Sequence, residues 1–276
     1  MSGQLYMGES GPACIVLGVA ELGATDLPTT CLKDHMVLVG FGCVGSRVGE
    51  ELQREELPFF VIEDRQELVE KLRARGIETI VDGAHSFAQF DFKQKDLGCD
   101  YFGTSLHKWL YAPKGTGLLY VKRDKIDKIW PLMAAEAKQA KDIRKFEEIG
   151  THSAAPKLAI GEALVFHNGI GGKRKEARLR YLSQYWMNKL KDVPKIRFNT
   201  SFDPNQSCAI ANVHIEGTDP KAVTKYLFDK HHIFTVPIVH EEFQGIRITP
   251  NLYTTLSELD RFCGVMESIA KNGLPA

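Results

Sequence analysis

The sequence predicts an α/β fold in which a doubly wound, mainly parallel sheet is followed by a small C-terminal α+β domain. Short apolar runs at 36–39, 59–62 and 78–81 alternate with segments of helical periodicity. Strands that alternate with helices are joined by right-handed crossovers, which make neighbouring strands parallel. Beyond Asn168 the strands and helices form a smaller α+β pattern, so a separate C-terminal domain is expected.

Apolar runs and glycines indicate where the strands and helices of the large domain begin and end. Residues 36–39 end at a glycine cluster, as a buried parallel strand does. A helix with Leu68 and Leu72 on one face is expected to end at Gly76, because glycine readily adopts the left-handed cap. The expected strands are 36–39, 59–62, 78–81, 100–104 and 117–121, and the expected helices are 44–55 and 66–75.

The second half of the chain is predicted to be helical over 155–191, with a break around 169–172. The remaining expected elements are strands near 207–215, 232–237 and 245–249 and helices near 219–230 and 255–271. The predicted divisions are a poorly determined lead-in at 1–33, a Rossmann-like segment at 34–81, the rest of the large domain at 82–168 and the small domain at 169–276.

Composition and charge exclude several classes of protein. The 276 residues carry 35 basic and 35 acidic side chains, so neither nucleic acid nor an acidic membrane is an expected partner. The six cysteines are scattered without a C-x-x-C pair, which predicts neither disulfides nor a metal site. The apolar run at 12–20 is too short to span a bilayer and lacks the basic flank of a signal peptide. A cytoplasmic protein is therefore expected.

Two polar segments lie where strands of the predicted sheet end. V-D-G-A-H places Asp82 and His85 after one strand, and S-L-H-K places Ser105, His107 and Lys108 after the next. Ligands of doubly wound sheets bind beyond the carboxyl ends of the strands. Pyridoxal phosphate chemistry requires a lysine that forms an imine and moves a proton at the substrate Cα. It also requires a carboxylate that keeps the pyridine nitrogen protonated.

With these segments the chain resembles the class V aminotransferases over about 67–271, nearest to their isopenicillin N epimerase-like branch. Those proteins are fold-type I pyridoxal phosphate enzymes and usually homodimers, which implies a homodimer that acts on a small-molecule amino acid. E-I-G-T at 148–151 matches a loop that reaches the neighbouring subunit's phosphate and nominates Thr151. G-I-R-I-T-P matches the C-terminal signature, whose arginine binds the substrate carboxylate, and this role falls to Arg247. A guanidinium binds a carboxylate through two parallel hydrogen bonds.

The same resemblance implies roles for the polar segments. Lys108 is the expected catalytic residue and imine lysine, and Asp82 is expected at the pyridine nitrogen. His85 is expected near the cofactor's 3′-oxygen, and Ser105 and His107 at its phosphate. The alternative is that these side chains have structural roles only. In that case His85 and His107 are hydrogen-bonded within the fold, and Ser105 caps the following turn.

Alternatives also remain open for Arg247 and for the reaction. The alternative for Arg247 is that it binds no substrate and is an ordinary arginine of an edge strand. Cysteine desulfurases place a nucleophilic cysteine on a loop before this arginine, and residues 231–246 contain no cysteine. Transamination or epimerisation is therefore the predicted reaction.

A second motif points to a different ligand. Gly40, Gly42 and Gly45 form a G-x-G-x-x-G loop after a predicted strand, and Glu63 ends the next strand. Such glycines let the backbone approach a pyrophosphate, and the acid binds a ribose hydroxyl. The segment at about 26–75 resembles the NAD-binding regulatory domains of potassium channels and antiporters, which implies NAD(H) or another adenine nucleotide and usually a dimer. The alternative is a glycine turn that serves strand–helix packing.

The two resemblances predict a chimera-like chain. A complete class V enzyme has a longer N-terminal part, which supplies a phosphate-gripping loop and a side chain stacked on the cofactor ring. The junction is expected near 71–77, where both families have a helix, a glycine and a strand. Three hypotheses follow. The chain is a pyridoxal phosphate enzyme in which another segment replaces the N-terminal part of the site, a nucleotide-binding regulatory module, or a folded but inert chimera.

Overall fold

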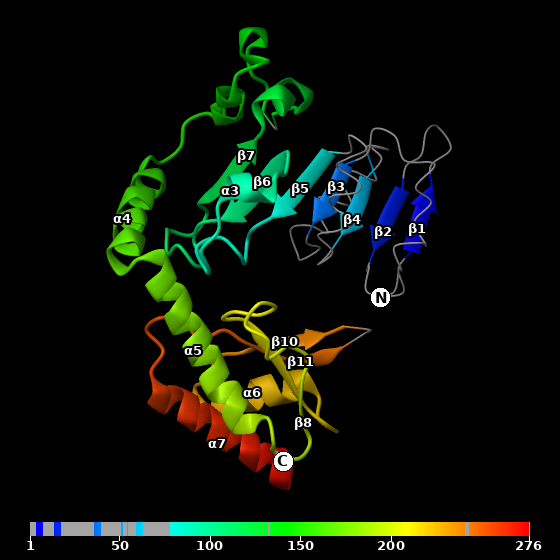
Figure 1. The fold of residues 1–276 in the computed structure, drawn as a ribbon, viewed down its shortest axis with the longest axis vertical. Helices are drawn as coiled ribbons and strands as arrows, with labels where there is room; N and C mark the ends of the chain where they lie inside the picture. Colours follow the sequence, from blue (N-terminus) through cyan, green and yellow to red (C-terminus); the bar gives the residue numbers. More distant parts are fainter. Residues whose placement is uncertain are drawn as a thin grey trace. The chain divides into compact units, whose positions relative to one another are not determined.

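The computed structural model describes residues 4–7, 14–17, 36–39, 51, 54, 59–62, 78–131, 133–240 and 243–275. The chain divides into two units, which are described separately below (Figure 1). Unit 1 comprises Met1–Ala88 and Phe92–His167, and unit 2 comprises Gln89–Asp91 and Asn168–Ala276.

Unit 1 contains a five-stranded sheet with the order β4-β3-β5-β6-β7. Its strands are β3 (Met36–Val39), β4 (Phe59–Ile62), β5 (Glu78–Asp82), β6 (Tyr101–Ser105) and β7 (Gly117–Val121). The first four are parallel to their neighbours, and β7 runs antiparallel to β6. The short connection 106–116 explains this reversal, because a parallel crossover needs about a dozen residues or more. The predicted mainly parallel α/β sheet is confirmed.

The N-terminal region also contains two strands that the sequence does not predict. They are β1 (Gln4–Met7) and β2 (Cys14–Leu17), which pair antiparallel with Gln4 opposite Leu17. Of the predicted helix at 44–55, the structure describes Glu51 and Arg54, which are helical and form an ion pair. The predicted helix at 66–75 lies outside the described residues.

Short helices connect the later elements of unit 1. They are α3 (Gln94–Leu97), η3 (Arg123–Lys128), η4 (Ala137–Gln139) and η5 (Ile143–Glu147). The buried Lys145 amine donates to the backbone oxygens of Ile126 and Ala140, which ties η5 to the segments before it. The long helix α4 (Ala155–Ile170) follows.

Unit 2 pairs three helices with a four-stranded antiparallel sheet of order β10-β11-β9-β8. Its elements are α5 (Gly172–Leu190), β8 (Ile196–Phe198), β9 (Ala211–Ile215), α6 (Pro220–His231), β10 (Val236–Val239), β11 (Gln244–Ile248) and α7 (Leu256–Asn272). The break predicted between the first two long helices falls at Gly171, whose φ of 86° is readily available to glycine.

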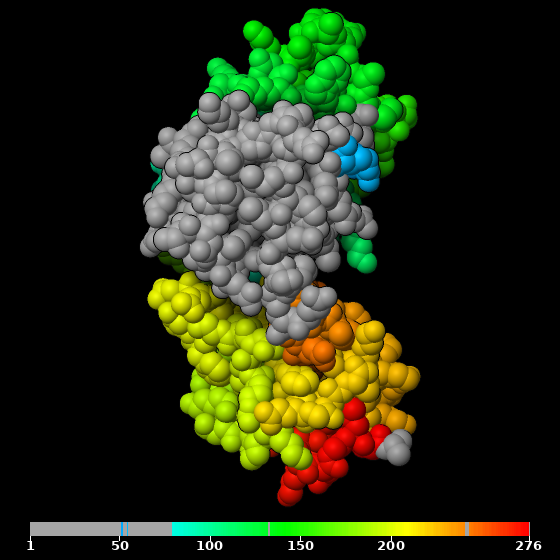
Figure 2. Space-filling view, turned by 90° about the vertical axis from the view of Figure 1, so that its right-hand side faces the viewer, coloured from blue at the N-terminus to red at the C-terminus, as the bar shows by residue number. Residues whose placement is uncertain are grey.

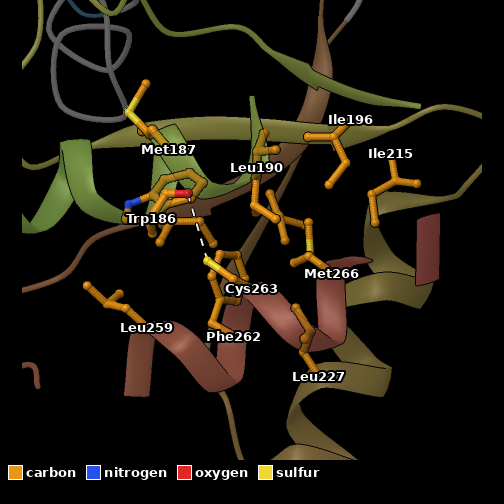
Figure 3. Packing of buried hydrophobic residues seen from close by; sticks show 14 of the residues in the cluster. Trp186, Met187, Leu190, Ile196, Ile215, Leu227, Leu259, Phe262, Cys263 and Met266 are labelled. Carbon is orange, nitrogen blue, oxygen red and sulfur yellow. Dashed lines mark hydrogen bonds between the residues drawn. The ribbon is translucent and has the colours of Figure 1, made fainter. Parts of the chain in front are cut away.

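Alternation along β9 defines the core face of unit 2. Ala211, Val213 and Ile215 are buried among the helices, whereas Asn212 and His214 lie on the opposite face of the sheet. Figure 3 shows this core, in which residues of the helices lie close to Ile196 and Ile215 of the strands, and the Cys263 thiol lies 3.8 Å from the backbone oxygen of Trp186. The sheet therefore has one apolar face covered by helices and one face with polar side chains.

Helix α7 follows the amphipathic pattern that the sequence predicts. Thr255 and Glu258 form a capping box at its first turn, which satisfies backbone donors at the helix start. Buried Phe262 and Met266 face the core, and Lys271 is exposed. The C-terminal end of the chain, which includes the end of α7, appears in red in Figure 2. Among the described helices, none has the length and apolar character that crossing a membrane requires.

Candidate active site

The ends of β5 and β6 bring the two predicted polar segments together at one edge of the sheet. Asp82 lies opposite Gly103 in the parallel register. The backbone N–H of Gly83 donates to the Gly103 oxygen at 2.7 Å, and the Thr104 hydroxyl donates to the Gly83 oxygen at 3.0 Å. The loop that follows β5 is therefore fixed directly on β6.

Asp82 is half-buried at the last position of β5. Its Oδ1 accepts a hydrogen bond from the backbone N–H of Ala84 at 2.9 Å, which fixes the orientation of the carboxylate. Within the described part of the chain, its other oxygen has no hydrogen-bond partner. That oxygen is available to hold a protonated nitrogen of a ligand.

Gly83 lies against the ring of Phe102, which leaves no space for a side chain at this position. A Cβ at this position would lie 2.1 Å from Cζ of Phe102. Phe102 is 1% exposed and packs against the rings of Phe87 and Phe92, so its ring has no room to withdraw. The glycine of the D-G-A-H motif thus serves packing under the loop that carries Asp82 and His85.

Lys108 and His85 come from different strand ends and meet. The Lys108 Nζ lies 3.3 Å from Nε2 of His85. Lys108 is half-buried and His85 is exposed. On either side of the lysine segment, Leu106 and Trp109 are buried, so the backbone between them is anchored while the lysine side chain reaches the histidine.

A small shared core holds both loops in place. Phe87 of the first loop packs with Leu106 and Leu110 of the second and with Ala163 of α4. Because the three segments share one apolar cluster, the separation between His85 and Lys108 depends on packing as well as on their own contact. This gives the pair a rigid support.

The structure does not join the other predicted residues of unit 1 to this pair. Ser105 ends β6 and is half-buried, and His107 is exposed in the following loop. Thr151 is exposed in the loop before α4. Among the described contacts, none of the three is hydrogen-bonded to His85 or Lys108. Their phosphate-binding roles stay predictions.

Arg247 belongs to unit 2 and lies in β11, on the face of the sheet away from the helical core. It is half-buried, and its Nε is fully buried without a hydrogen-bond partner among the described residues. No carboxylate of the described chain pairs with its charge. A buried cationic donor without a partner suits an anionic ligand, because such a donor is costly to leave unpaired.

Asn212 and Asn199 are polar residues near this arginine that the sequence analysis missed. Asn212 faces Arg247 across the β9–β11 pairing, and Asn199 donates to its side-chain oxygen at 2.7 Å. The polar residues that alternate with apolar ones in A-N-V-H-I were a usable signal for a polar sheet face.

The glycine-loop residues Gly40, Gly42, Gly45 and Glu63 lie outside the described residues. Over the part of the chain that the structure describes, no group of three His, Cys, Asp or Glu side chains is arranged to hold a metal ion. The described polar residues therefore fall into two sets, one at the ends of β5 and β6 in unit 1 and one around Arg247 in unit 2.

The described residues fit pyridoxal phosphate. Asp82 offers an oriented carboxylate with a free oxygen for the ring nitrogen, and Lys108 offers an amine at the same sheet edge. Ser105 at the end of β6 and His107 in the loop after it offer a hydroxyl and an imidazole for a phosphate. Arg247, with its unpaired buried donor, offers a group for a substrate carboxylate.

The chain is similar to curated proteins over about three quarters of its length. It is 30% identical to the isopenicillin N epimerase of Streptomyces clavuligerus over 220 residues, which cover 74% of this chain and 55% of that protein. It is 26% identical to the probable cysteine desulfurase 1 of Mycobacterium leprae, with 75% and 36% covered. The chain thus spans about half the length, or less, of the curated relatives it matches.

Solved structures share the fold. The apo cysteine desulfurase of Thermococcus onnurineus NA1 superposes with a TM-score of 0.73 at 18% identity, covering 87% of this chain and 73% of that one. A C-DES variant with glycine covalently linked to its PLP cofactor gives a TM-score of 0.68 at 17% identity, with 85% and 74% covered. These likenesses confirm the fold-type I architecture of the described residues.

The class V aminotransferase family matches residues 61–237. This match begins before the predicted start at 67 and contains the whole predicted junction region at 71–77, so 61–75 aligns with this family. It contains Asp82, His85 and Lys108, which the structure brings to one edge of the sheet. With this match over more than half of its length, the chain belongs to the class V aminotransferase family.

Proposed function

We propose that the protein is a pyridoxal phosphate enzyme that acts at the Cα of an amino acid, by transamination or epimerisation, with Lys108 as the cofactor lysine. The observation that carries the proposal is the 3.3 Å contact of Lys108 with His85, beside the oriented carboxylate of Asp82. The similarity to a protein named isopenicillin N epimerase supports chemistry at an amino-acid Cα.

Each residue has a distinct task in the proposed reaction. Pyridoxal phosphate, when bound, supplies a protonated ring that accepts the electron pair left at the substrate Cα. Asp82 would keep the ring nitrogen protonated through its free oxygen, and Ser105 and His107 would hold the phosphate. Arg247 would bind the substrate carboxylate and so fix which Cα bond faces the lysine.

Lys108 would act as the general base and acid that moves the proton at the substrate Cα. His85 contacts Nζ, so it orients the amine and accepts a hydrogen bond from it when the amine is protonated. The two outcomes differ in where the proton goes. Epimerisation would require a second acid to return a proton to the opposite face of Cα, whereas in transamination the proton would not return to Cα.

Desulfurase chemistry is not proposed, although cysteine desulfurases are among the relatives. Residues 231–246 lack a cysteine, and the described thiols Cys99, Cys208 and Cys263 are all buried. Burial raises the pKa of Cys208 to about 11 and that of Cys263 to about 12. A thiol held neutral in an apolar interior is a poor nucleophile.

We also propose a homodimer in which Thr151 contributes to the neighbouring subunit's phosphate site. In support, Thr151 is exposed in the loop before α4, and α4 exposes Leu158 (75%) and Val165 (68%). Exposed apolar side chains of this size are typical of surfaces that bind another protein. Light scattering of the purified protein measures the oligomeric state, and a monomer at micromolar concentration would contradict the proposal.

The nucleotide-binding alternative rests on the motif of Gly40, Gly42 and Gly45 with Glu63. It predicts that NAD(H) binds in addition to pyridoxal phosphate, and that Gly42→Trp abolishes NAD(H) binding. Titration of NADH into wild type and Gly42→Trp separates the possibilities. Equal binding by both proteins excludes a site at the glycine loop.

The experiment that tests the main proposal is reconstitution with pyridoxal phosphate. We expect a yellow protein, and borohydride reduction followed by peptide mass mapping should place the adduct on Lys108. Lys108→Ala should lose the colour, whereas Lys114→Ala, which changes an exposed lysine six positions on, should keep it. An adduct elsewhere, or colour in Lys108→Ala, refutes the assignment. An inert chimera would show no adduct at any lysine.

A further inference from the structure

The polar face of the sheet in unit 2 carries two hydrogen-bond donors without partners. Asn212 of β9 and Arg247 of β11 are directly opposed in the antiparallel register, so their side chains project from the same face. Nδ2 of Asn212 and Nε of Arg247 are both fully buried, and the described residues supply no acceptor for either. Asn212 as a whole is only 9% exposed.

The hydrogen-bond network fixes which end of the Asn212 amide is the donor. The Asn199 side chain lies 2.9 Å from the backbone oxygen of Gln244, which can only accept, so Asn199 presents its NH₂ group there. The same NH₂ group lies 2.7 Å from the Asn212 side chain, which must therefore present its oxygen. The NH₂ group of Asn212 is consequently left unpaired, and a flipped amide would break this chain of contacts.

Gly245 leaves the space in which the Asn212 amide lies. A Cβ at Gly245 would come within 2.3 Å of the Asn212 Oδ1 and within 2.7 Å of the Val213 backbone oxygen. The glycine two positions before Arg247 thus allows Asn212 to lie across β11. The arrangement is built by three strand segments rather than left over at the surface.

Two unpaired donors on one face, one of them on a cationic side chain, match an anionic acceptor with two oxygens. A buried donor that is left without an acceptor destabilises the protein, and a charged donor does so more than a neutral one. We infer that Asn212 and Arg247 together form the subsite for the substrate carboxylate, with Asn212 as a specificity-determining donor and Asn199 as the residue that positions it. This inference rests on the proposed function, in which Arg247 binds that carboxylate.

The first test observes the two donors directly in the full chain purified with pyridoxal phosphate. The Asn212 side-chain NH₂ and Arg247 Nε–H signals are identified in ¹H–¹⁵N spectra by their loss in Asn212→Asp and Arg247→Lys. Titration with L-alanine should shift both signals with one common Kd. Titration with ethylamine, which lacks a carboxylate, should leave them in place.

The second test reverses the preference of the subsite. Asn212→Asp keeps an oxygen for Asn199 but replaces the donor with a carboxylate oxygen, which repels a ligand carboxylate and accepts from a ligand amide. The ratio of the Kd values for L-alanine and L-alaninamide should therefore rise at least about tenfold, the size of a lost charge-assisted hydrogen bond. Asn188→Asp, which makes the same substitution at an exposed position of α5, should leave the ratio unchanged.

The outcomes separate this inference from the proposed function. If the adduct forms on Lys108 but the Asn212 signal and the Kd ratio do not respond, the inference is wrong and the function stands. If no adduct forms on Lys108 but both donors respond to L-alanine, the subsite stands and the function is wrong. Failure of both responses overturns both. The wild-type titration decides the inference even if Asn212→Asp does not fold.

Discussion

The Lys108 Nζ lies 3.3 Å from Nε2 of His85, although the two residues are 23 positions apart and follow different strands. Their contact depends on the pairing of β5 with β6 and on the apolar cluster under both loops. A protonated lysine amine donates to a neutral imidazole, so the histidine tautomer with a free Nε2 is favoured while the amine is charged. His85 thereby restricts where the amine points.

His85→Leu tests this orienting role. We expect Lys108 still to form the borohydride-trapped adduct, because the amine itself remains. Turnover of an amino-acid substrate should fall by roughly tenfold to a hundredfold, which corresponds to a hydrogen bond of about 1.5–3 kcal/mol to a charged group. His85→Gln retains an acceptor and should recover part of the loss. Steady-state kinetics measures kcat, and an unchanged kcat in His85→Leu contradicts the role.

Gly83→Ala tests the packing beneath the site. The added Cβ would lie 2.1 Å from Cζ of Phe102, whose ring is 1% exposed and confined by Phe87 and Phe92. We expect the free energy of unfolding to fall by about 1–3 kcal/mol, as in overpacked cores. Urea denaturation measures it.

Gly161→Ala is the matched control in the same unit. A Cβ at Gly161 meets no atom within 4 Å, and the residue lies within α4. Alanine has the higher helix propensity, so this variant should be as stable as wild type or more stable by up to about 1 kcal/mol. Equal destabilisation by both substitutions would show that the Phe102 contact is not the cause.

The sequence predicts the sheet of unit 1 well because each strand is an apolar run that ends in a distinctive motif. Residues 36–39 and 59–62 are strands as expected, and 78–82 and 101–105 differ from the predictions by one residue. The polar segments after β5 and β6 lie at one edge because parallel strands align their carboxyl ends. Motif and topology together were enough to pair Lys108 with the segment of Asp82.

The pairing of Asn212 with Arg247 could not be predicted, because it depends on the register of β9 and β11. Asn199 follows a strand of three residues, β8, which is too short to show a period. Its two hydrogen bonds reach β9 and β11, 13 and 45 positions away. Composition and periodicity describe each strand separately and do not determine which residues face one another across a sheet. Arg247 was predicted because the G-I-R-I-T-P motif carries the family resemblance, whereas Asn212 lies in no such motif.

Lys175 predicts a pH dependence of stability. It is 1% exposed in α5, and burial lowers its pKa from 10.5 to about 8. Below pH 8 the folded and unfolded states both carry the charge, and the burial penalty is fully present. Between about pH 8 and 10.5 the folded state has released its proton and the unfolded state has not, so stability rises with pH. A shift of this size corresponds to about 3 kcal/mol.

Lys175→Met should remove this contribution. The difference in unfolding free energy between Lys175→Met and wild type should favour the variant most below pH 8 and should shrink by pH 10.5. The control is Lys173→Met, at an exposed position two residues earlier. Its difference from wild type should not change with pH. Parallel curves for Lys175→Met and wild type would mean that the lysine does not titrate in this range.

Gly245→Ala links the stability of unit 2 to its proposed carboxylate subsite. The added Cβ would lie 2.3 Å from the Asn212 Oδ1, which can move, and 2.7 Å from the Val213 backbone oxygen, which can move only with β9. We therefore expect about 1–3 kcal/mol of destabilisation and weaker binding of L-alanine. Gly264→Ala in α7, where a Cβ meets nothing within 4 Å, should change neither quantity appreciably.

The double variant Gly245→Ala with Asn212→Ala separates the two clashes. Removal of the asparagine side chain relieves its contact with the new Cβ and leaves the clash with the Val213 oxygen. Stability should therefore recover in part relative to the sum of the single changes, which a double-mutant cycle measures. Affinity for L-alanine should not recover, because the donor is gone. If affinity returned with stability, Gly245 would influence binding through the fold of β11 alone, without Asn212.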